Sequence, residues 1–262
     1  MRLSEIIAVL EEVAPTARAE EWDNVGLIAG DPAQEVTRAL LAIDYTAAVA
    51  DEARGLGCEL VVAYHPPIFA AQKRFVAGGA TALVFDAVRR GVALYSPHTA
   101  LDVADGGTND VLADLIGLAD RAPLRPAPGA TVGIGRVGSL PSVPRAGLIA
   151  RIKEGLGLDR LLVAGPGDGP NDGVVRRAAV CAGAGGDLLG DALRERADLY
   201  LTGELRHHDA LRAARAGMTV VCTLHSHSER VTLARLAERL AARLPGVALA
   251  CSRTDRDPFD FA

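Results

Sequence analysis

Residues 217–230 read GMTVVCTLHSHSER, and this stretch shows the pattern that decides the fold. An apolar run over 217–224 is followed at once by two histidines and then by a helical pattern. Continuous apolar runs of about four to eight residues are typical of strands that are buried on both faces, as parallel sheets require. The stretch therefore predicts a buried strand that leads directly into a helix.

The same alternation recurs along the chain. Five further apolar runs, bounded by glycine or charged residues, predict strands at residues 38–44, 58–64, 91–96, 176–183 and 197–203. Helical patterns lie between these runs, and such alternation is typical of α/β proteins. We therefore expect two α/β lobes in a layered α/β/α arrangement with mainly parallel central strands.

Two segments rich in proline and glycine interrupt the alternation. Residues 121–147 indicate a linker that leads into an irregular edge strand, and residues 163–175 indicate a loop with several Gly, Asp and Pro residues. We expect the first lobe over residues 1–125 and the second over residues 126–262.

Composition excludes several classes of protein. The chain has 262 residues, of which 49% are hydrophobic and 23% are charged, so disordered, collagen-like and coiled-coil chains are excluded. Its formal net charge of -5, without long runs of like charge, argues against a general nucleic-acid binder. No apolar stretch reaches the roughly 18 residues of a membrane span, and the N-terminus predicts an amphipathic helix, not a signal peptide.

The cysteines indicate a reducing compartment. Cys58, Cys181, Cys222 and Cys251 are scattered, without a Cys-x-x-Cys pair. This spacing disfavours a disulfide framework or a zinc ribbon and favours free thiols. We therefore expect a cytoplasmic protein.

All six histidines directly follow a predicted strand. They are His65, His98, His207, His208, His225 and His227. In open α/β sheets the carboxyl ends of the strands gather at one edge, where ligands and metals bind. The pattern therefore predicts a functional site at that edge.

Two interpretations of His225 and Glu229 stay open at this point. Ser226 with Glu229 three residues later matches a capping box, in which Glu229 would only satisfy backbone N–H groups. Alternatively, His225 and Glu229 bind a metal ion. His98 with Asp102 four residues later, and His65, favour the metal, since imidazoles with carboxylates suit Zn, Fe, Mn or Ni.

Other motifs carry less weight. Residues 181–186, CAGAGG, have two possible interpretations: a turn that holds phosphate on backbone N–H groups, or a tight structural turn. The segment lacks the Gly-x-Gly-x-x-Gly spacing of phosphate-binding turns, which favours the structural turn. Two interpretations of Lys73 and Arg74 stay open: they face an anionic substrate, or they are solvated charges of a loop. Neither a Gly-x-Ser-x-Gly elbow nor a His-Glu-x-x-His motif occurs, which leaves serine hydrolases and zincins without support.

Seven motifs together resemble the Nif-three-like dinuclear metal-centre proteins, which are catalogued as GTP cyclohydrolase I type 2 homologues. In chain order they are EWDNVGL, YHPPIF, SPHTALD with GGTNDVLA, CAGAGG, LTGELRHHDAL, HSHSER and TDRDPF. The resemblance implies paired α/β lobes with a two-metal site in the cleft between them, assembled into a ring-shaped homohexamer. The chain resembles the short form, which lacks an inserted domain. The matching metal ligands are His65, Asp102, His225 and Glu229.

One departure from the family pattern affects the number of metals. Bacterial members have two successive histidines where this chain has Tyr64 and His65. The motifs YHPPIF, SPHTA and TDRDP are instead similar to those of the eukaryotic branch, which also has a tyrosine at this position. A phenol is a poor ligand at neutral pH because its pKa is about 10 unless a metal lowers it. One or two divalent metal ions per chain are therefore expected, with Tyr64, His98 or His227 as further candidate ligands.

The leading functional hypothesis is a metal-dependent hydrolase of a nucleotide-like or other small phosphorylated substrate. The metal would polarise the scissile group and lower the pKa of bound water to about 7. His98, His207 and His208 are candidate catalytic residues, because the pKa of an imidazole, about 6.5, suits proton transfer. The alternative is a metal-binding scaffold or regulator that acts through protein partners, and a purely structural metal is the third possibility.

Overall fold

The computed structural model describes residues 1–127, 131–166 and 173–260. It contains two compact units: a first unit of residues 1–104 and 232–258, and a second unit of residues 105–231 and 259–262. This division differs from the expected boundary after residue 125. Within the expected loop 163–175, residues 167–172 lie outside the described residues.

The first unit contains a five-stranded sheet in the order β1-β4-β3-β2-β11. The strands are β1 (Gly26–Ala29), β2 (Arg38–Ala42), β3 (Leu60–Ala63), β4 (Ala93–Ser96) and β11 (Ala248–Cys251). Only β1 runs antiparallel to its neighbour, and the other pairs are parallel. Every residue of β3 and β4 is buried, so the three strands predicted in this half of the chain are confirmed.

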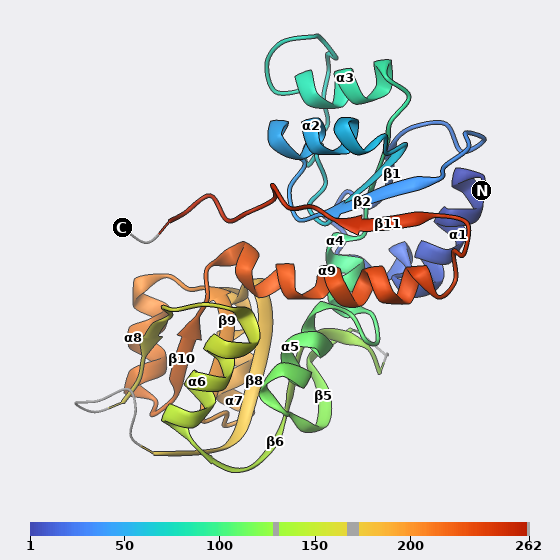
Figure 1. Cartoon of the computed structure of the whole chain (residues 1–262). Helices are drawn as coiled ribbons and strands as arrows, with labels where there is room; N and C mark the ends of the chain where they lie inside the picture. Colours follow the sequence, from blue (N-terminus) through green and yellow to red (C-terminus); the bar gives the residue numbers. More distant parts are fainter. Residues whose placement is uncertain (128–130, 167–172, 261–262) are drawn as a thin grey trace. The chain divides into compact units, whose positions relative to one another are not determined.

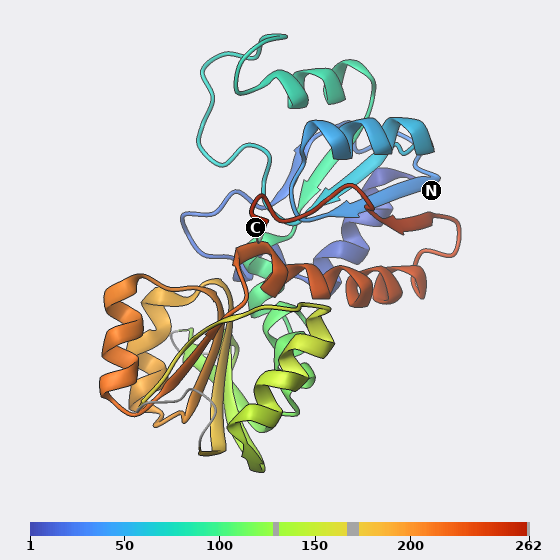
Figure 2. The same cartoon turned by 60° about the vertical axis from the view of Figure 1, so that its left-hand side comes forward.

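Helices cover both faces of this sheet, because its strands present apolar side chains on both sides (Figures 1 and 2). On one face, Leu40 packs in a cluster with residues of α2 (Ala47–Leu56) and α3 (Ala82–Arg89). On the other face, Leu41 packs with α1 (Leu3–Val13) and with the later turns of α9 (His225–Ala241). The short helices η1 (Thr16–Arg18) and α4 (His98–Val103) complete the unit.

The second unit contains a six-stranded sheet in the order β5-β6-β8-β9-β10-β7. The strands are β5 (Ala119–Pro126), β6 (Gly133–Pro144), β7 (Leu162–Ala164), β8 (Val174–Ala184), β9 (Leu199–Glu204) and β10 (Thr219–Cys222). Only β8, β9 and β10 are mutually parallel, so this sheet is mixed whereas the first is mainly parallel. The strands predicted at 176–183, 197–203 and 217–224 are confirmed.

The segment 121–147 contains the expected irregular edge strand, but its first residues do not form a linker. It supplies most of β5 and all of β6, which pair antiparallel. Proline is compatible with β5 because this strand lies at the edge of the sheet, where one row of backbone N–H groups has no ladder partner. Since β5 joins the second sheet and β11 pairs with β2, the chain divides differently from the sequence-based expectation.

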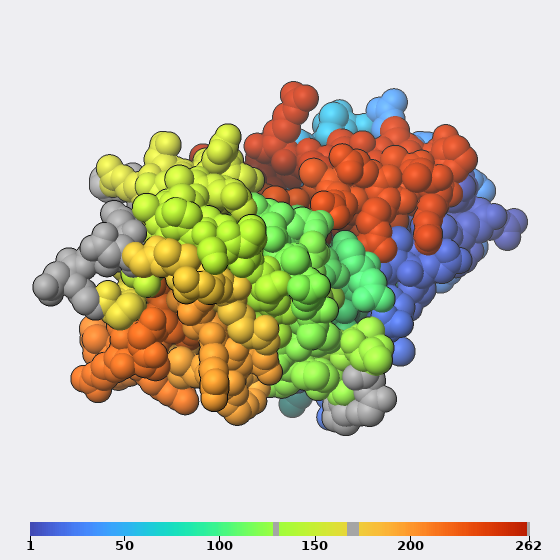
Figure 3. All heavy atoms as spheres, turned by 90° about the horizontal axis from the view of Figure 1, so that it is seen from below, coloured from blue at the N-terminus to red at the C-terminus, as the bar shows by residue number. Residues whose placement is uncertain are grey.

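Helices also cover both faces of the second sheet. α5 (Thr108–Ile116) and α6 (Arg145–Leu156) pack on one face, where Figure 3 shows the yellow-green surface of α6 beside the green surface of α5. η2 (Gly185–Leu188), α7 (Leu189–Arg194) and α8 (His207–Arg215) pack on the other. The layered α/β/α arrangement is therefore confirmed in each unit. Among the described residues, no helix combines the length and the apolar character that crossing a membrane demands.

Candidate functional site

The structure confirms that every histidine follows a strand. His65 follows β3, His98 opens α4 after β4, His207 and His208 open α8 after β9, and His225 and His227 lie in the first turn of α9 after β10. His65 and His98 lie in the first unit, and the other four histidines lie in the second.

In the first unit, residues from three segments meet at the carboxyl ends of β3 and β4. The ring of His98 lies 5.2 Å from that of His65 and 5.7 Å from that of Tyr64, measured between centroids. The hydroxyl of Tyr64 donates a hydrogen bond to Oδ1 of Asp102, and both residues are buried. The expected ligands His65 and Asp102 therefore belong to one cluster, which also contains Tyr64 and His98.

Carboxylates hold the two imidazoles of this cluster. Nδ1 of His65 lies 2.9 Å from Oδ1 of Asp44, which follows β2. Nδ1 of His98 lies 2.8 Å from Oδ1 of Asp23, in the EWDNVG motif. Sequence reasoning missed both carboxylates, since Asp23 reads as a turn residue and Asp44 as the end of a strand. Asp23 lies just before β1 and Asp44 just after β2, and only the formation of the sheet brings these residues close to the histidines that follow β3 and β4.

Asp23 is held in its ionised form. Burial raises the pKa of this carboxyl, but hydrogen bonds from His98 and Thr99 outweigh that effect, so its pKa lies below the usual value. The hydroxyl and backbone N–H of Thr99 both donate to Oδ2 of Asp23. The ionised carboxylate fixes the orientation of the His98 ring and keeps a proton on its Nδ1.

In the second unit, His225 lies between two carboxylates. Its Nδ1 is 3.1 Å from Oε1 of Glu204, at the end of β9, and its Nε2 is 3.2 Å from Oε1 of Glu229. The side chain of Glu229 is only 4% exposed. Leu224, with φ of 70°, lets the chain pass from β10 to α9 at once. Sequence reasoning identified the pair His225 and Glu229 but missed Glu204.

The capping-box interpretation of Ser226 and Glu229 is wrong. α9 already begins at His225, so both residues lie inside the helix. Oγ of Ser226 accepts a hydrogen bond from Nη2 of Arg230 at 3.0 Å. Because the helix starts earlier than a capping box at Ser226 requires, Glu229 lies one turn from His225 on the same face.

The glycine-rich segment 181–186 packs directly against this pair. A Cβ atom on Gly183, which has φ of +64°, would lie 2.8 Å from Oε1 of Glu229. The N–H of Gly183 donates to Oγ of Ser228 at 2.8 Å, and the N–H of Gly185 donates to Oγ1 of Thr202 at 3.1 Å. These N–H groups are engaged by the protein, so the interpretation as a tight structural turn is confirmed.

Other singled-out residues lie apart from these groups. The rings of His207 and His208 are exposed and lie 5.3 Å from one another, and within the described chain they have no hydrogen bond to another side chain. Nδ1 of His227 lies 2.9 Å from the carbonyl oxygen of Thr223. Lys73 and Arg74 are exposed loop residues. The structure thus brings His98 to the site but places His207 and His208 elsewhere.

The donor chemistry of both groups fits a divalent metal. A histidine whose Nδ1–H donates to a carboxylate presents a lone pair on Nε2, and this arrangement is typical of metal-binding histidines. His65 and His225 both have such a carboxylate, and Glu229 adds a buried oxygen donor next to His225. Imidazole nitrogen and carboxylate oxygen are the ligands that Zn, Fe, Mn and Ni accept.

Comparison with known proteins identifies relatives of this chain. The model of Duf34/NIF3 (NGG1p interacting factor 3) matches residues 1–258. The "GTP cyclohydrolase 1 type 2 homolog" of Clostridium perfringens (strain 13 / Type A) is 33% identical over 271 residues, covering 100% of both chains. The "NIF3-like protein 1" of Drosophila melanogaster is 34% identical, covering 98% of this chain and 88% of its own. A Bacillus cereus protein related to NIF3 has the same fold, with a TM-score of 0.91 at 23% identity over 100% of this chain and 99% of its own.

Proposed function

Because the chain belongs to the Duf34/NIF3 (NGG1p interacting factor 3) family, we propose that it is a metal-dependent hydrolase of a nucleotide-like or other small phosphorylated substrate. The name of the Clostridium perfringens relative, a GTP cyclohydrolase 1 type 2 homolog, supports a nucleotide-like substrate. We propose His65 and Asp102 of the first unit, with His225 and Glu229 of the second, as the metal ligands.

One observation carries this proposal. Each proposed histidine ligand has its Nδ1 within hydrogen-bonding distance of a carboxylate, at 2.9 Å for His65 and 3.1 Å for His225. A histidine that serves only as a surface residue gains little from such a fixed tautomer, whereas a metal ligand needs one. When bound, a divalent ion supplies Lewis-acid polarisation and lowers the pKa of a coordinated water.

The chain's own residues supply the remaining functions. Asp44 and Glu204 orient the two imidazoles. His98, oriented by Asp23 and with its side chain 13% exposed, is the proposed proton shuttle. His207 and His208 are left out of this role because both are exposed and, within the described part of the chain, neither has a hydrogen bond to a residue of the two groups.

Exposed apolar residues favour a second candidate function, that of a scaffold acting through protein partners. Trp22, Phe69, Phe75 and Val76 of the first unit are 47–59% exposed, and the rings of Trp22 and Phe69 lie 5.8 Å apart. Exposed large apolar side chains that gather in one place are typical of association surfaces. The homohexamer implied by the family resemblance would use such a surface, and we propose self-association for this chain.

The deciding experiment is a hydrolysis assay on nucleotides and phosphoesters, with and without chelator. We expect turnover that chelator abolishes and that added Zn²⁺, Mn²⁺, Fe²⁺ or Ni²⁺ restores. His65→Ala and His225→Ala should each abolish it, and His208→Gln should leave it unchanged. If no substrate shows chelator-sensitive turnover while the purified chain retains metal and self-associates, the scaffold is favoured.

A further inference from the structure

The second unit contains a cavity of about 490 Å³ whose lining includes none of the proposed metal ligands. It is formed by the ends of β8 and β9, by η2 and by the start of α8, and its lining residues are Ala184, Gly186, Asp187, Glu204, Leu205, Arg206 and Asp209. Because β8 and β9 are parallel, the cavity lies at the carboxyl ends of parallel strands, where α/β sheets bind ligands. Its volume lies in the range of small-molecule sites, and it is open to solvent, since Asp187, Glu204 and Arg206 are exposed.

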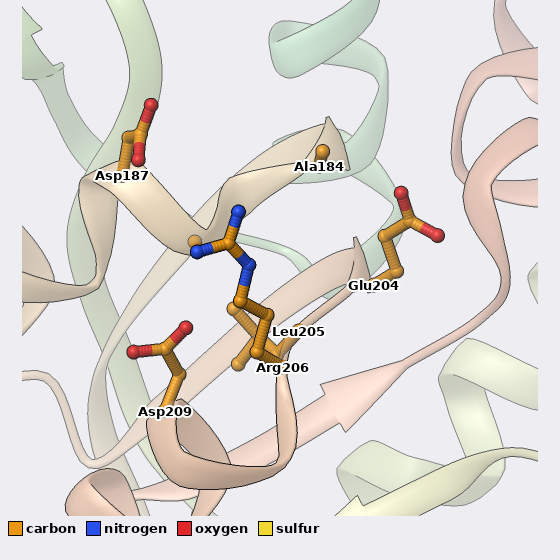
Figure 4. Close-up of a pocket in the computed structure, with 7 residues that line it drawn as sticks. Ala184, Asp187, Glu204, Leu205, Arg206 and Asp209 are labelled. Carbon is orange, nitrogen blue, oxygen red and sulfur yellow. The ribbon is translucent and has the colours of Figure 1, made fainter.

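Arg206 is the only cation in this lining, and its guanidinium is not engaged. Within the described chain its side chain has neither a hydrogen bond nor an ion pair, although Asp187 and Asp209 line the same cavity. Its backbone is nevertheless fixed, since its carbonyl oxygen accepts from the N–H of Asp209 and of Ala210 at the start of α8. Figure 4 shows the guanidinium between Asp187 and Asp209 on one side and Glu204 on the other. A guanidinium with all its donors available matches the oxygens of a phosphate or carboxylate.

The three carboxylates restrict which anion can bind. The lining carries Asp187, Glu204 and Asp209 against Arg206 alone, so it is net negative. A ligand with one anionic group satisfies Arg206, and its hydroxyl or amino groups donate to Asp187 and Asp209. The extra phosphates of a polyphosphate would lie close to carboxylates and be repelled.

Glu204 connects the cavity to the proposed metal ligands of this unit. It lines the cavity, and its Oε1 lies 3.1 Å from Nδ1 of His225. A ligand in the cavity therefore lies beside the carboxylate that orients His225. This position suits a substrate pocket, because the bound molecule is held next to the residues of the proposed chemistry.

We propose that this cavity is the substrate pocket and that it selects a phosphomonoester of a hydroxyl- or amino-bearing molecule over a polyphosphate. Arg206 binds the phosphate, and Asp187 and Asp209 accept hydrogen bonds from the rest of the ligand. This inference rests on the proposed hydrolase function and adds a substrate class to it. A nucleoside monophosphate and a sugar phosphate share this chemistry.

The test is calorimetric titration of the purified protein with AMP, glucose 6-phosphate and ATP, each with and without chelator. Arg206→Gln should weaken binding of the monoesters about 10-fold or more, because charge-assisted hydrogen bonds are lost. Arg212→Gln, which removes an exposed arginine of α8 outside the cavity, should change monoester binding less than about twofold. AMP should bind more tightly than ATP, and Asp187→Asn with Asp209→Asn should reduce that preference.

Unchanged monoester binding in Arg206→Gln, or tighter binding of ATP than of AMP in chelator, overturns the proposal. Its failure can be told from failure of the hydrolase function. Arg206-dependent binding without chelator-sensitive turnover retains the pocket and refutes the hydrolase. Chelator-sensitive turnover with the same KM in Arg206→Gln retains the hydrolase and refutes the pocket.

Discussion

Nε2 of His225 and Oε1 of Glu229 lie 3.2 Å apart, one turn from each other on α9. Since Nδ1 of His225 is held by Glu204, the lone pair on Nε2 faces the buried carboxylate of Glu229. A lone pair and a carboxylate oxygen repel at this separation unless a proton or a cation lies between them. The pair is therefore built for a positive charge.

Replacing Glu229 by glutamine should remove metal without unfolding the chain. Glutamine has the same shape, but its neutral amide is a poorer ligand than a carboxylate. We expect metal content after dialysis to fall about 10-fold or more, with circular dichroism unchanged. Inductively coupled plasma mass spectrometry checks this. Full metal content in the variant would refute Glu229 as a ligand.

Gly183→Ala should displace the side chains of His225 and Glu229, because it adds an atom to the neighbouring backbone. Its Cβ would lie 2.8 Å from Oε1 of Glu229 and 3.3 Å from Nε2 of His225, at a φ of +64° that side chains disfavour. We expect the free energy of unfolding to fall by roughly 1–3 kcal/mol and metal retention to weaken. Gly147→Ala in α6 is the control, because its Cβ would meet nothing within 4 Å. Equal urea midpoints for the two variants would contradict the prediction.

Tyr64 tests the number of metal ions. Its hydroxyl donates to buried Asp102, so Tyr64→Phe should lower the free energy of unfolding by about 1–3 kcal/mol. Tyr64→His places a second imidazole beside His65, and we expect the metal content per chain to rise above that of wild type. The fluorescence of Trp22, the only tryptophan, reports on this cluster because its ring lies 6.0 Å from that of His98. Unchanged metal content in Tyr64→His would show that Tyr64 does not limit it.

Glu52 should make attachment of the C-terminal segment sensitive to acid. Slight burial raises its pKa, but hydrogen bonds from Ser252, Arg253 and Thr254 lower that pKa from 4.5 to about 2. Because the folded pKa is depressed, the stabilisation is present above pH 4.5 and is lost as the pH falls toward 2. Solvent screening limits the effect to about 1 kcal/mol.

Chemical denaturation of wild type and Glu52→Gln between pH 5 and about pH 2 measures this effect. The variant should be less stable at pH 5 and should match wild type at the acid end. Glu238→Gln, an exposed carboxylate of the same unit, should follow the wild-type curve. A constant difference between wild type and Glu52→Gln at every pH would contradict the linkage.

Interactions between distant segments account for what sequence reasoning missed. Residues 121–147 indicated an edge strand only after a linker, because Pro123 and Pro126 are locally typical of loops and only pairing with β6 makes their segment a strand. The partners Asp23, Asp44 and Glu204 were likewise invisible, since each lies 21 or more residues from its histidine.

Short-range chemistry, by contrast, was readable from the residues alone. Continuous apolar runs marked the buried strands, because a strand covered on both faces must be apolar throughout. The position of each histidine just past a strand, and the pairing of His225 with Glu229 four residues later, follow from the same local order. Tertiary structure alone decided that Glu204 lies against Nδ1 of His225 and that Gly183 leaves space for the carboxylate of Glu229, because these residues come from strands distant in the chain.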